Sequence, residues 1–173
     1  MQKIDITIVG DVYVGKSSLV AGIKKQKQIT STTIGVEVDF LTYKNTKLCF
    51  WDTSGQTDFR QFISSYYKKA NVIVIVVTYD QIHRFTYWYD TIKTHTPDKP
   101  IILCINKIDR YGGDFVVPDY VKDFDCARVY LTSMYIREKG LSQAFDYFLS
   151  LGGSSVCLED VPAEVSTDCC IIV

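Results

Sequence analysis

Residues 4–17 read IDITIVGDVYVGKS, in which an apolar run with strand-like alternation passes directly into the pattern GxxxxGKS. In this pattern, the backbone N–H groups of a glycine-rich loop and of the following helix N-terminus form an anion site. Lys16 would reach the β- and γ-phosphates of a nucleotide, and the Ser17 hydroxyl can ligate Mg²⁺. The stretch therefore predicts a strand, a phosphate-binding loop and a helix. The residues assigned to the nucleotide here are Gly10, Asp11, Val12, Tyr13, Val14, Gly15, Lys16, Ser17 and Ser18.

The rest of the chain continues this alternation of strand and helix. Short continuous apolar runs are typical of strands buried on both faces, and residues 44–47 between two of them indicate a tight antiparallel hairpin. We therefore predict an α/β fold with a mostly parallel six-stranded sheet, one antiparallel hairpin strand and helices on both faces. The strands are expected at 4–9, 36–43, 48–51, 72–77, 101–105 and 128–131. Apolar helical stripes are formed by Phe85, Trp88, Tyr89 and Ile92, and by Leu141, Ala144, Phe145 and Phe148.

Length and composition fit one domain. The chain has 173 residues, of which 47% are hydrophobic, and this is enough to bury a single core. A formal net charge of -1 argues against nucleic acid as a partner. The longest apolar run, 72–77, is far shorter than the ~20 residues that cross a bilayer. Helical periodicity ends near Leu151, so we predict a folded domain over 1–151 and a flexible tail over 152–173.

A second motif, Asn106-Lys107-Ile108-Asp109, follows directly after the predicted strand 101–105. Ligands of open α/β sheets bind outside the carboxyl ends of the strands, so this motif falls where a base would lie. The Asp109 carboxylate can accept hydrogen bonds from both N1–H and the 2-amino group of guanine. Adenine offers no matching pair of donors and would leave the charge unpaired. We therefore predict GTP and GDP as ligands, with Asn106, Lys107 and Asp109 at the base.

With these two motifs, the sequence resembles the Ras superfamily of small GTPases over essentially its whole length, and within it the Rab family. Three further segments carry the likeness: TIGV at 33–36, WDTSGQ at 51–56 and YYKKA at 66–70. The resemblance implies a single P-loop GTPase domain with Mg²⁺ held by Ser17, Thr33 and Asp52. It also implies that the Gly55 amide senses the γ-phosphate and that Gln56 is the catalytic residue, which positions the attacking water. Ser133 and Met134 would lie beside the base.

By the same resemblance, the protein would be a monomeric switch that hydrolyses GTP slowly. The γ-phosphate and Mg²⁺ would hold two loops in order, and hydrolysis would release them. The expected partners are an exchange factor, a GTPase-activating protein (GAP) and effectors at the switch face, and the expected setting is vesicle trafficking.

Several positions depart from the family pattern. Val12 and Tyr13 stand where small residues are usual, so bulk beside the γ-phosphate is expected to crowd the arginine finger of a GAP. Gln28 or Ile29 occupies the place of the aromatic side chain that stacks on the base, and Tyr135 replaces a lysine of the base site. We expect uncatalysed nucleotide exchange to be faster than in typical family members, because both contacts are missing.

The chain ends in Cys169-Cys170-Ile171-Ile172-Val173, whose last four residues fit a prenylation box and whose cysteine pair resembles a Rab tail. Residues 152–168 contain no Lys or Arg, so a polybasic second signal is lacking. Lipids on Cys169 and Cys170 are therefore the expected anchor, since one chain alone binds membranes marginally. We expect the protein on the cytoplasmic face of endomembranes, in exchange with the cytosol.

Two other functions remain open at this point. One is a guanine-nucleotide-binding module with little or no hydrolysis, which Val12 and Tyr13 favour. The other is a P-loop ATPase or kinase, which would need an adenine site and an acceptor site, and against which Asn106 and Asp109 argue.

Overall fold

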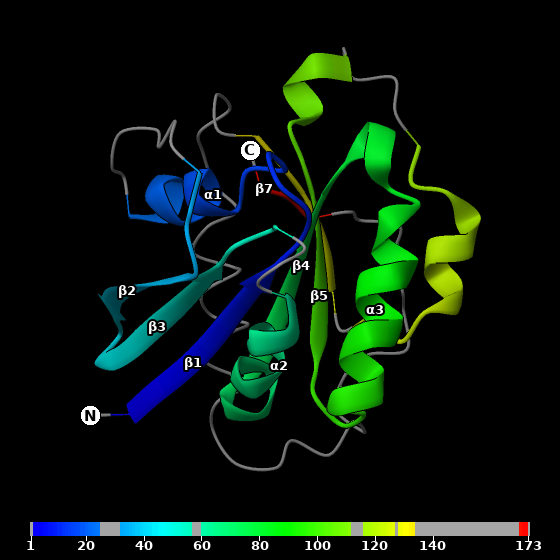
Figure 1. Ribbon diagram of the computed structural model, residues 1–173. Helices are drawn as coiled ribbons and strands as arrows, with labels where there is room; N and C mark the ends of the chain where they lie inside the picture. Colours follow the sequence, from blue (N-terminus) through cyan, green and yellow to red (C-terminus); the bar gives the residue numbers. More distant parts are fainter. Residues whose placement is uncertain are drawn as a thin grey trace.

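A computed structural model describes residues 2–24, 32–56, 60–111, 116–126, 128–133 and 170–172. The strands form one sheet in the order β2-β3-β1-β4-β5-β6-β7 (Figure 1). All neighbouring strands are parallel except β2 and β3, which are antiparallel. This confirms the predicted α/β fold. The strands are β1 (Gln2–Val9), β2 (Val36–Tyr43), β3 (Thr46–Thr53), β4 (Val72–Thr78), β5 (Ile101–Asn106), β6 (Arg128–Thr132) and β7 (Cys170–Ile172).

The central strands are apolar on both faces because helices cover the sheet from both sides. Every residue of β4 and of β5 is buried, and β-branched side chains dominate both. The edge strand β2, in contrast, has no fully buried residue. The sequence pattern of continuous apolar runs thus identifies the middle of the sheet.

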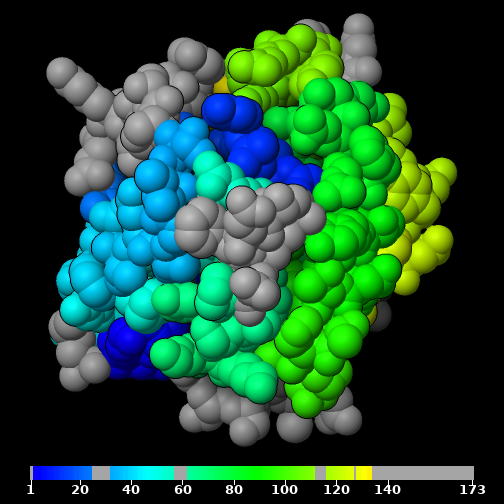
Figure 2. Space-filling view, in the orientation of Figure 1, coloured from blue at the N-terminus to red at the C-terminus, as the bar shows by residue number. Residues whose placement is uncertain are grey.

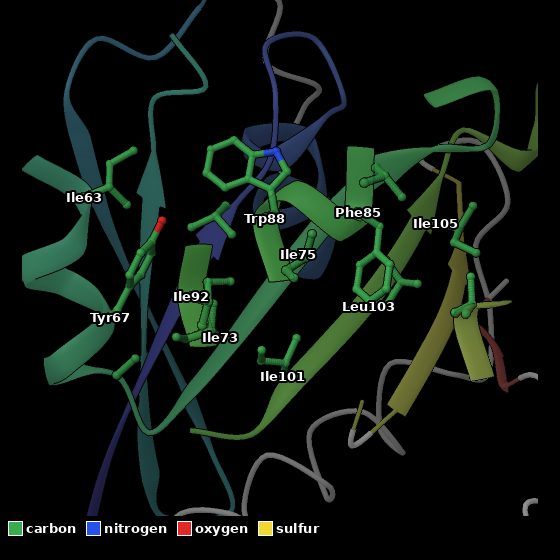
Figure 3. Packing of buried hydrophobic residues seen from close by; sticks show 14 of the residues in the cluster. Ile63, Tyr67, Ile73, Ile75, Phe85, Trp88, Ile92, Ile101, Leu103 and Ile105 are labelled. Atoms are coloured by element: carbon green, nitrogen blue, oxygen red, sulfur yellow. The ribbon is translucent and has the colours of Figure 1, made fainter. Parts of the chain in front are cut away.

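Three α-helices are described: α1 (Lys16–Ile23), α2 (Arg60–Lys69) and α3 (Arg84–His95). Val20 of α1 packs in a cluster with alternate β1 residues on one face of the sheet. Helices α2 and α3 cover the other face, where their side chains pack on β4 and β5 (Figures 1 and 3). The stripe predicted for α3 is confirmed, with Phe85, Trp88 and Ile92 buried. The stripe predicted over 141–148 lies outside the described residues.

Short 3₁₀ helices complete the described chain: η2 (Tyr79–Gln81), η3 (Ile108–Tyr111) and η4 (Asp119–Asp123). The predicted hairpin is confirmed, since Tyr43 pairs with Thr46 across the two-residue turn Lys44-Asn45. Both turn residues have positive φ, 44° and 62°, as the tight turns that suit twisted hairpins require.

The sheet has one strand more than the six that the sequence predicts. Residues Cys170–Ile172, which we assigned to a flexible tail, form β7 and pair in parallel with β6, in the register Tyr130 to Cys170. For these three residues the expectation of a free tail is wrong. The physical reason is that β6 would otherwise present unpaired backbone groups, and a β-prone Cys-Ile-Ile segment can satisfy them.

The polar motifs gather where the strands end. The phosphate loop follows β1, residues 54–56 follow β3, residues 107–109 follow β5, and Ser133 follows β6. Because β1, β3, β5 and β6 run in the same direction, these segments meet at one edge of the sheet. Within the described part of the chain, no helix is long and apolar enough to traverse a bilayer.

Candidate functional site

The phosphate loop needs glycine at both of its ends. Gly10 has φ 146°, and a Cβ there would lie 2.2 Å from the carbonyl oxygen of Val76 in β4. Gly15 has φ 98°, and its Cβ would lie 2.4 Å from Asn106 Nδ2. Any side chain at these positions would push the loop away from the sheet. Figure 2 shows the dark-blue loop region at the surface, between cyan residues of the β2 region and green residues of α3.

Lys16, the first residue of α1, is buried beneath this loop with only 6% of its side chain exposed. Its Nζ donates to the carbonyl oxygens of Gly10 at 3.1 Å and of Asp11 at 2.8 Å. Burial lowers the pKa of Lys16 to about 8, although Asp52 and Asp11 act in the opposite direction. The hydrogen bonds of this buried ammonium go to neutral carbonyls, an arrangement that fits an anion bound in the loop.

The three residues expected to hold Mg²⁺ come together beside Lys16. The hydroxyl oxygens of Ser17 and Thr33 are 2.8 Å apart, and Thr33 donates to Asp52 Oδ2 at 3.3 Å. Burial raises the pKa of Asp52. Its Oδ1 is buried and accepts no hydrogen bond from the described part of the chain. Two hydroxyls and a carboxylate with an unsatisfied oxygen are the hard donors that Mg²⁺ prefers, so the residues present fit the ion.

The segment after β3 packs directly on the phosphate loop. A Cβ on Gly55 would lie 2.4 Å from the carbonyl carbon of Asp11 and 2.5 Å from the amide nitrogen of Val12. The preceding residue, Ser54, donates its N–H to the Gly35 carbonyl at 2.7 Å. The backbone N–H of Gln56 donates to Ser54 Oγ at 3.3 Å. The segment before β2 and the segment after β3 are therefore hydrogen-bonded to each other beside the phosphate loop.

Asn106 connects the loop to the base side of the site. Its Nδ2 donates to the Val14 carbonyl at 2.9 Å, and its Oδ1 accepts from the Thr132 hydroxyl at 3.0 Å. All of these atoms are buried. The register of β5 and β6, in which Ile105 pairs with Leu131, brings Thr132 next to Asn106.

Lys107 and Asp109 mark the place expected for the base. Lys107 Nζ donates to the carbonyl oxygen of Tyr13, and Ser133 Oγ donates to Asp109 Oδ1. Burial, with Arg110 nearby, lowers the pKa of Lys107. Tyr13 has φ 63° and a side chain that is 77% exposed, so its bulk lies outside the packed loop. Asp109 as a whole is exposed.

The predicted site residues between Gly10 and Ser133 are thus brought to one edge of the sheet. Met134, Cys169 and the positions 28 and 29 lie outside the described residues. Cys170 lies in β7, at the far edge of the sheet from β2.

Three contributors were not predicted from the sequence: Thr132, Ser54 and Arg84. Thr132 and Ser54 could have been found as polar residues that end strands at the same edge as the motifs. Arg84, the first residue of α3, pairs with Asp11 across 73 positions. No local pattern signals that contact.

Comparison with known proteins agrees with this geometry. Residues 5–109 match the family model described as "Ras of Complex, Roc, domain of DAPkinase". Ras-related protein SEC4 of Saccharomyces cerevisiae is 35% identical over 60% of this chain and 53% of its own length. Ras-related protein RABC1 of Arabidopsis thaliana is 33% identical over 70% of this chain and 64% of its own length. Rab-like protein 2A of Mus musculus is 33% identical over 62% of this chain and 52% of its own length. The chain thus spans less than two thirds of these relatives. It belongs to the Ras superfamily of small GTPases, in which it is a divergent Rab-like member.

Proposed function

We propose that this protein is a molecular switch that binds GTP and GDP with Mg²⁺, hydrolyses GTP slowly and recruits effectors when GTP is bound. The observation that carries the proposal is Lys16, a buried ammonium whose hydrogen bonds go to two main-chain carbonyls. Phosphate oxygens would supply the missing negative charge. Asp109, on the same edge of the sheet, supplies a carboxylate for the guanine donors.

In the proposed reaction, water attacks the γ-phosphate and the bond to the β–γ bridging oxygen breaks, which yields GDP and phosphate. Mg²⁺, held by Ser17, Thr33 and Asp52, would supply stabilisation of the charge that develops on the phosphates. Lys16 would bind the β- and γ-phosphates, and Gln56 would orient the water. Hydrolysis is expected to be slow without a GAP, because an arginine finger from such a partner increases the hydrolysis rate by about 10³ to 10⁵ in these enzymes.

The switch would consist of the segments around Thr33 and Gly55. Loss of the γ-phosphate would remove the expected acceptor of the Gly55 amide, and the Ser54–Gly35 hydrogen bond would transmit this change to β2. Exposed apolar side chains lie on these segments and next to them: Ile34, Val38, Phe40 and Phe62. Exposed apolar side chains beside a ligand-controlled loop suit effector proteins.

Single-turnover hydrolysis of GTP by the purified chain tests the proposal. We expect slow release of phosphate that falls at least about tenfold in Gln56→Leu, with GDP affinity unchanged. Phosphate release above background that is identical in both proteins would show that Gln56 is not the catalytic residue. Tight GTP binding with no release at all would support the alternative of a non-hydrolysing binding module.

We also propose membrane attachment through lipids on Cys169 and Cys170, and a role in vesicle trafficking at endomembranes. The support is the cysteine pair in Cys-Cys-Ile-Ile-Val and the likeness to Rab proteins. Because Cys170 pairs with Tyr130 in the sheet, attachment would require residues 170–172 to leave the edge of β6. Membrane binding and pairing of β7 are therefore expected to exclude each other.

A further inference from the structure

Arg84 forms a two-point ion pair with Asp11 of the phosphate loop. Its Nε donates to Asp11 Oδ2 at 2.8 Å and its Nη2 donates to Asp11 Oδ1 at 3.4 Å. The guanidinium also lies over the ring of Tyr87, 4.9 Å from its centroid. The Asp11 side chain is 16% exposed and that of Arg84 35%. Planar, bidentate contact of this kind fixes direction as well as charge, so the start of α3 orients the loop at Asp11.

The peptide that joins Asp11 to Val12 is where several parts of the site meet. Its carbonyl oxygen accepts the hydrogen bond from Lys16 Nζ at 2.8 Å. Its carbonyl carbon and the amide nitrogen of Val12 are the atoms against which Gly55 packs, too close for any Cβ. A small rotation of this peptide would therefore move both the carbonyl oxygen that accepts from Lys16 and the backbone atoms that contact Gly55.

We propose that Arg84 is a positioning residue for the γ-phosphate half of the site, acting through Asp11 on the Asp11–Val12 peptide. This inference rests on the proposed function, since it concerns how the chain distinguishes GTP from GDP. The Gly55 amide is expected to contact the γ-phosphate, so its position against this peptide matters more for GTP than for GDP. Arg84 also neutralises a carboxylate that lies next to the phosphate-binding lysine, and GTP carries more negative charge than GDP. Both effects stabilise the GTP complex more than the GDP complex.

A merely structural ion pair would behave differently. Pairs that are partly exposed contribute little to the free energy of unfolding. A structural effect would also lower the affinity for both nucleotides equally. The discriminating quantity is therefore the ratio of the dissociation constants for a non-hydrolysable GTP analogue and for GDP, measured by fluorescence competition with the full chain and Mg²⁺.

The experiment compares wild type with Arg84→Ala, Arg84→Lys and the double variant Asp11→Ala with Arg84→Ala. Lys93→Ala, on the same helix and paired with exposed Asp125, is the matched control. We expect Arg84→Ala to raise the ratio about fivefold to tenfold and to slow single-turnover hydrolysis by a similar factor. Arg84→Lys should recover part of the loss, because a lysine restores the charge but not the two-point contact. The double variant should also recover part of it, because the Asp11 charge that is no longer balanced by Arg84 is removed as well.

Two results would overturn the inference while the proposed function stands. One is a ratio and a hydrolysis rate for Arg84→Ala within about twofold of wild type. The other is an equal loss of affinity for both nucleotides. If wild type bound no guanine nucleotide, the proposed function would fail and this inference with it. The Lys93→Ala control should match wild type in every assay.

Discussion

Lys16 offers a test of the phosphate site that does not depend on the resemblance to small GTPases. Burial lowers its pKa to about 8 from the ordinary 10.5, so keeping the ammonium charged in the nucleotide-free fold costs about 3 kcal/mol. The folded chain therefore binds fewer protons than the unfolded chain between these two values. Stability of the nucleotide-free protein is expected to rise as pH increases through this window, by up to that amount.

The change that isolates this effect is Lys16→Met, which keeps most of the length of the side chain and removes its charge. In chemical unfolding, the stability of the nucleotide-free variant relative to nucleotide-free wild type should decrease by about 2–3 kcal/mol between about pH 7 and about pH 10. The difference between the two proteins is the useful quantity. Thiols with raised pKa values, at buried Cys49 and Cys104 and at partly buried Cys126, act in the opposite direction on both proteins equally.

The pH dependence of nucleotide binding provides a second test of the Lys16 pKa. Bound phosphates keep Lys16 protonated, so binding takes up a proton once the pH exceeds about 8, and affinity should then fall by up to about tenfold per pH unit. Calorimetry in buffers of different ionisation enthalpy measures the proton uptake. Lys122→Met, at an exposed site, should behave as wild type. A gap in stability that does not change with pH would refute the reasoning.

Three further outcomes are expected. Asn106→Ala removes two buried hydrogen bonds and should lower the free energy of unfolding by about 2–4 kcal/mol, measured by denaturant titration; a loss under about 1 kcal/mol would contradict its role as a bridge. Val12→Gly with Tyr13→Gly should restore stimulation by a GAP that inserts an arginine, and no gain in stimulated rate would mean that these side chains point away from the γ-phosphate. Removing both Cys169 and Cys170 should leave the protein cytosolic on fractionation, and a double variant that still pellets with membranes would point to a protein partner.

The central sheet could be predicted because burial on both faces leaves a plain sequence signal. The run VIVIVVT at 72–78 is wholly buried in β4. The phosphate loop could be predicted for a similar reason. The backbone at positions 10 and 15 has positive φ and close neighbours, so it requires glycine. The predicted ends of the strands were less accurate. β3 includes Thr46 and Thr53, whose polar side chains are buried although their residue type does not indicate it.

Contacts that depend on register or on the angle of a helix could not be predicted. Thr132 reaches Asn106 only because β5 and β6 pair with Ile105 opposite Leu131. Arg84 reaches Asp11 because α3 starts beside the phosphate loop, which no pattern near residue 84 determines. The pairing of β7 was missed because three residues are too short to give a periodic signal.

The most direct test of the central claim is the base specificity set by Asp109. The chain and its Asp109→Asn variant would be titrated with GDP, ADP and xanthosine diphosphate in Mg²⁺, with displacement of a fluorescent nucleotide as the readout. We predict that wild type prefers GDP over ADP by at least about a hundredfold, because only guanine offers two donors to the carboxylate. The variant should shift its preference towards xanthosine diphosphate, whose 2-oxo group accepts a hydrogen bond from the new amide. Equal affinity of wild type for ADP and GDP would contradict the assignment of Asp109 and with it the account of this protein as a guanine-nucleotide switch.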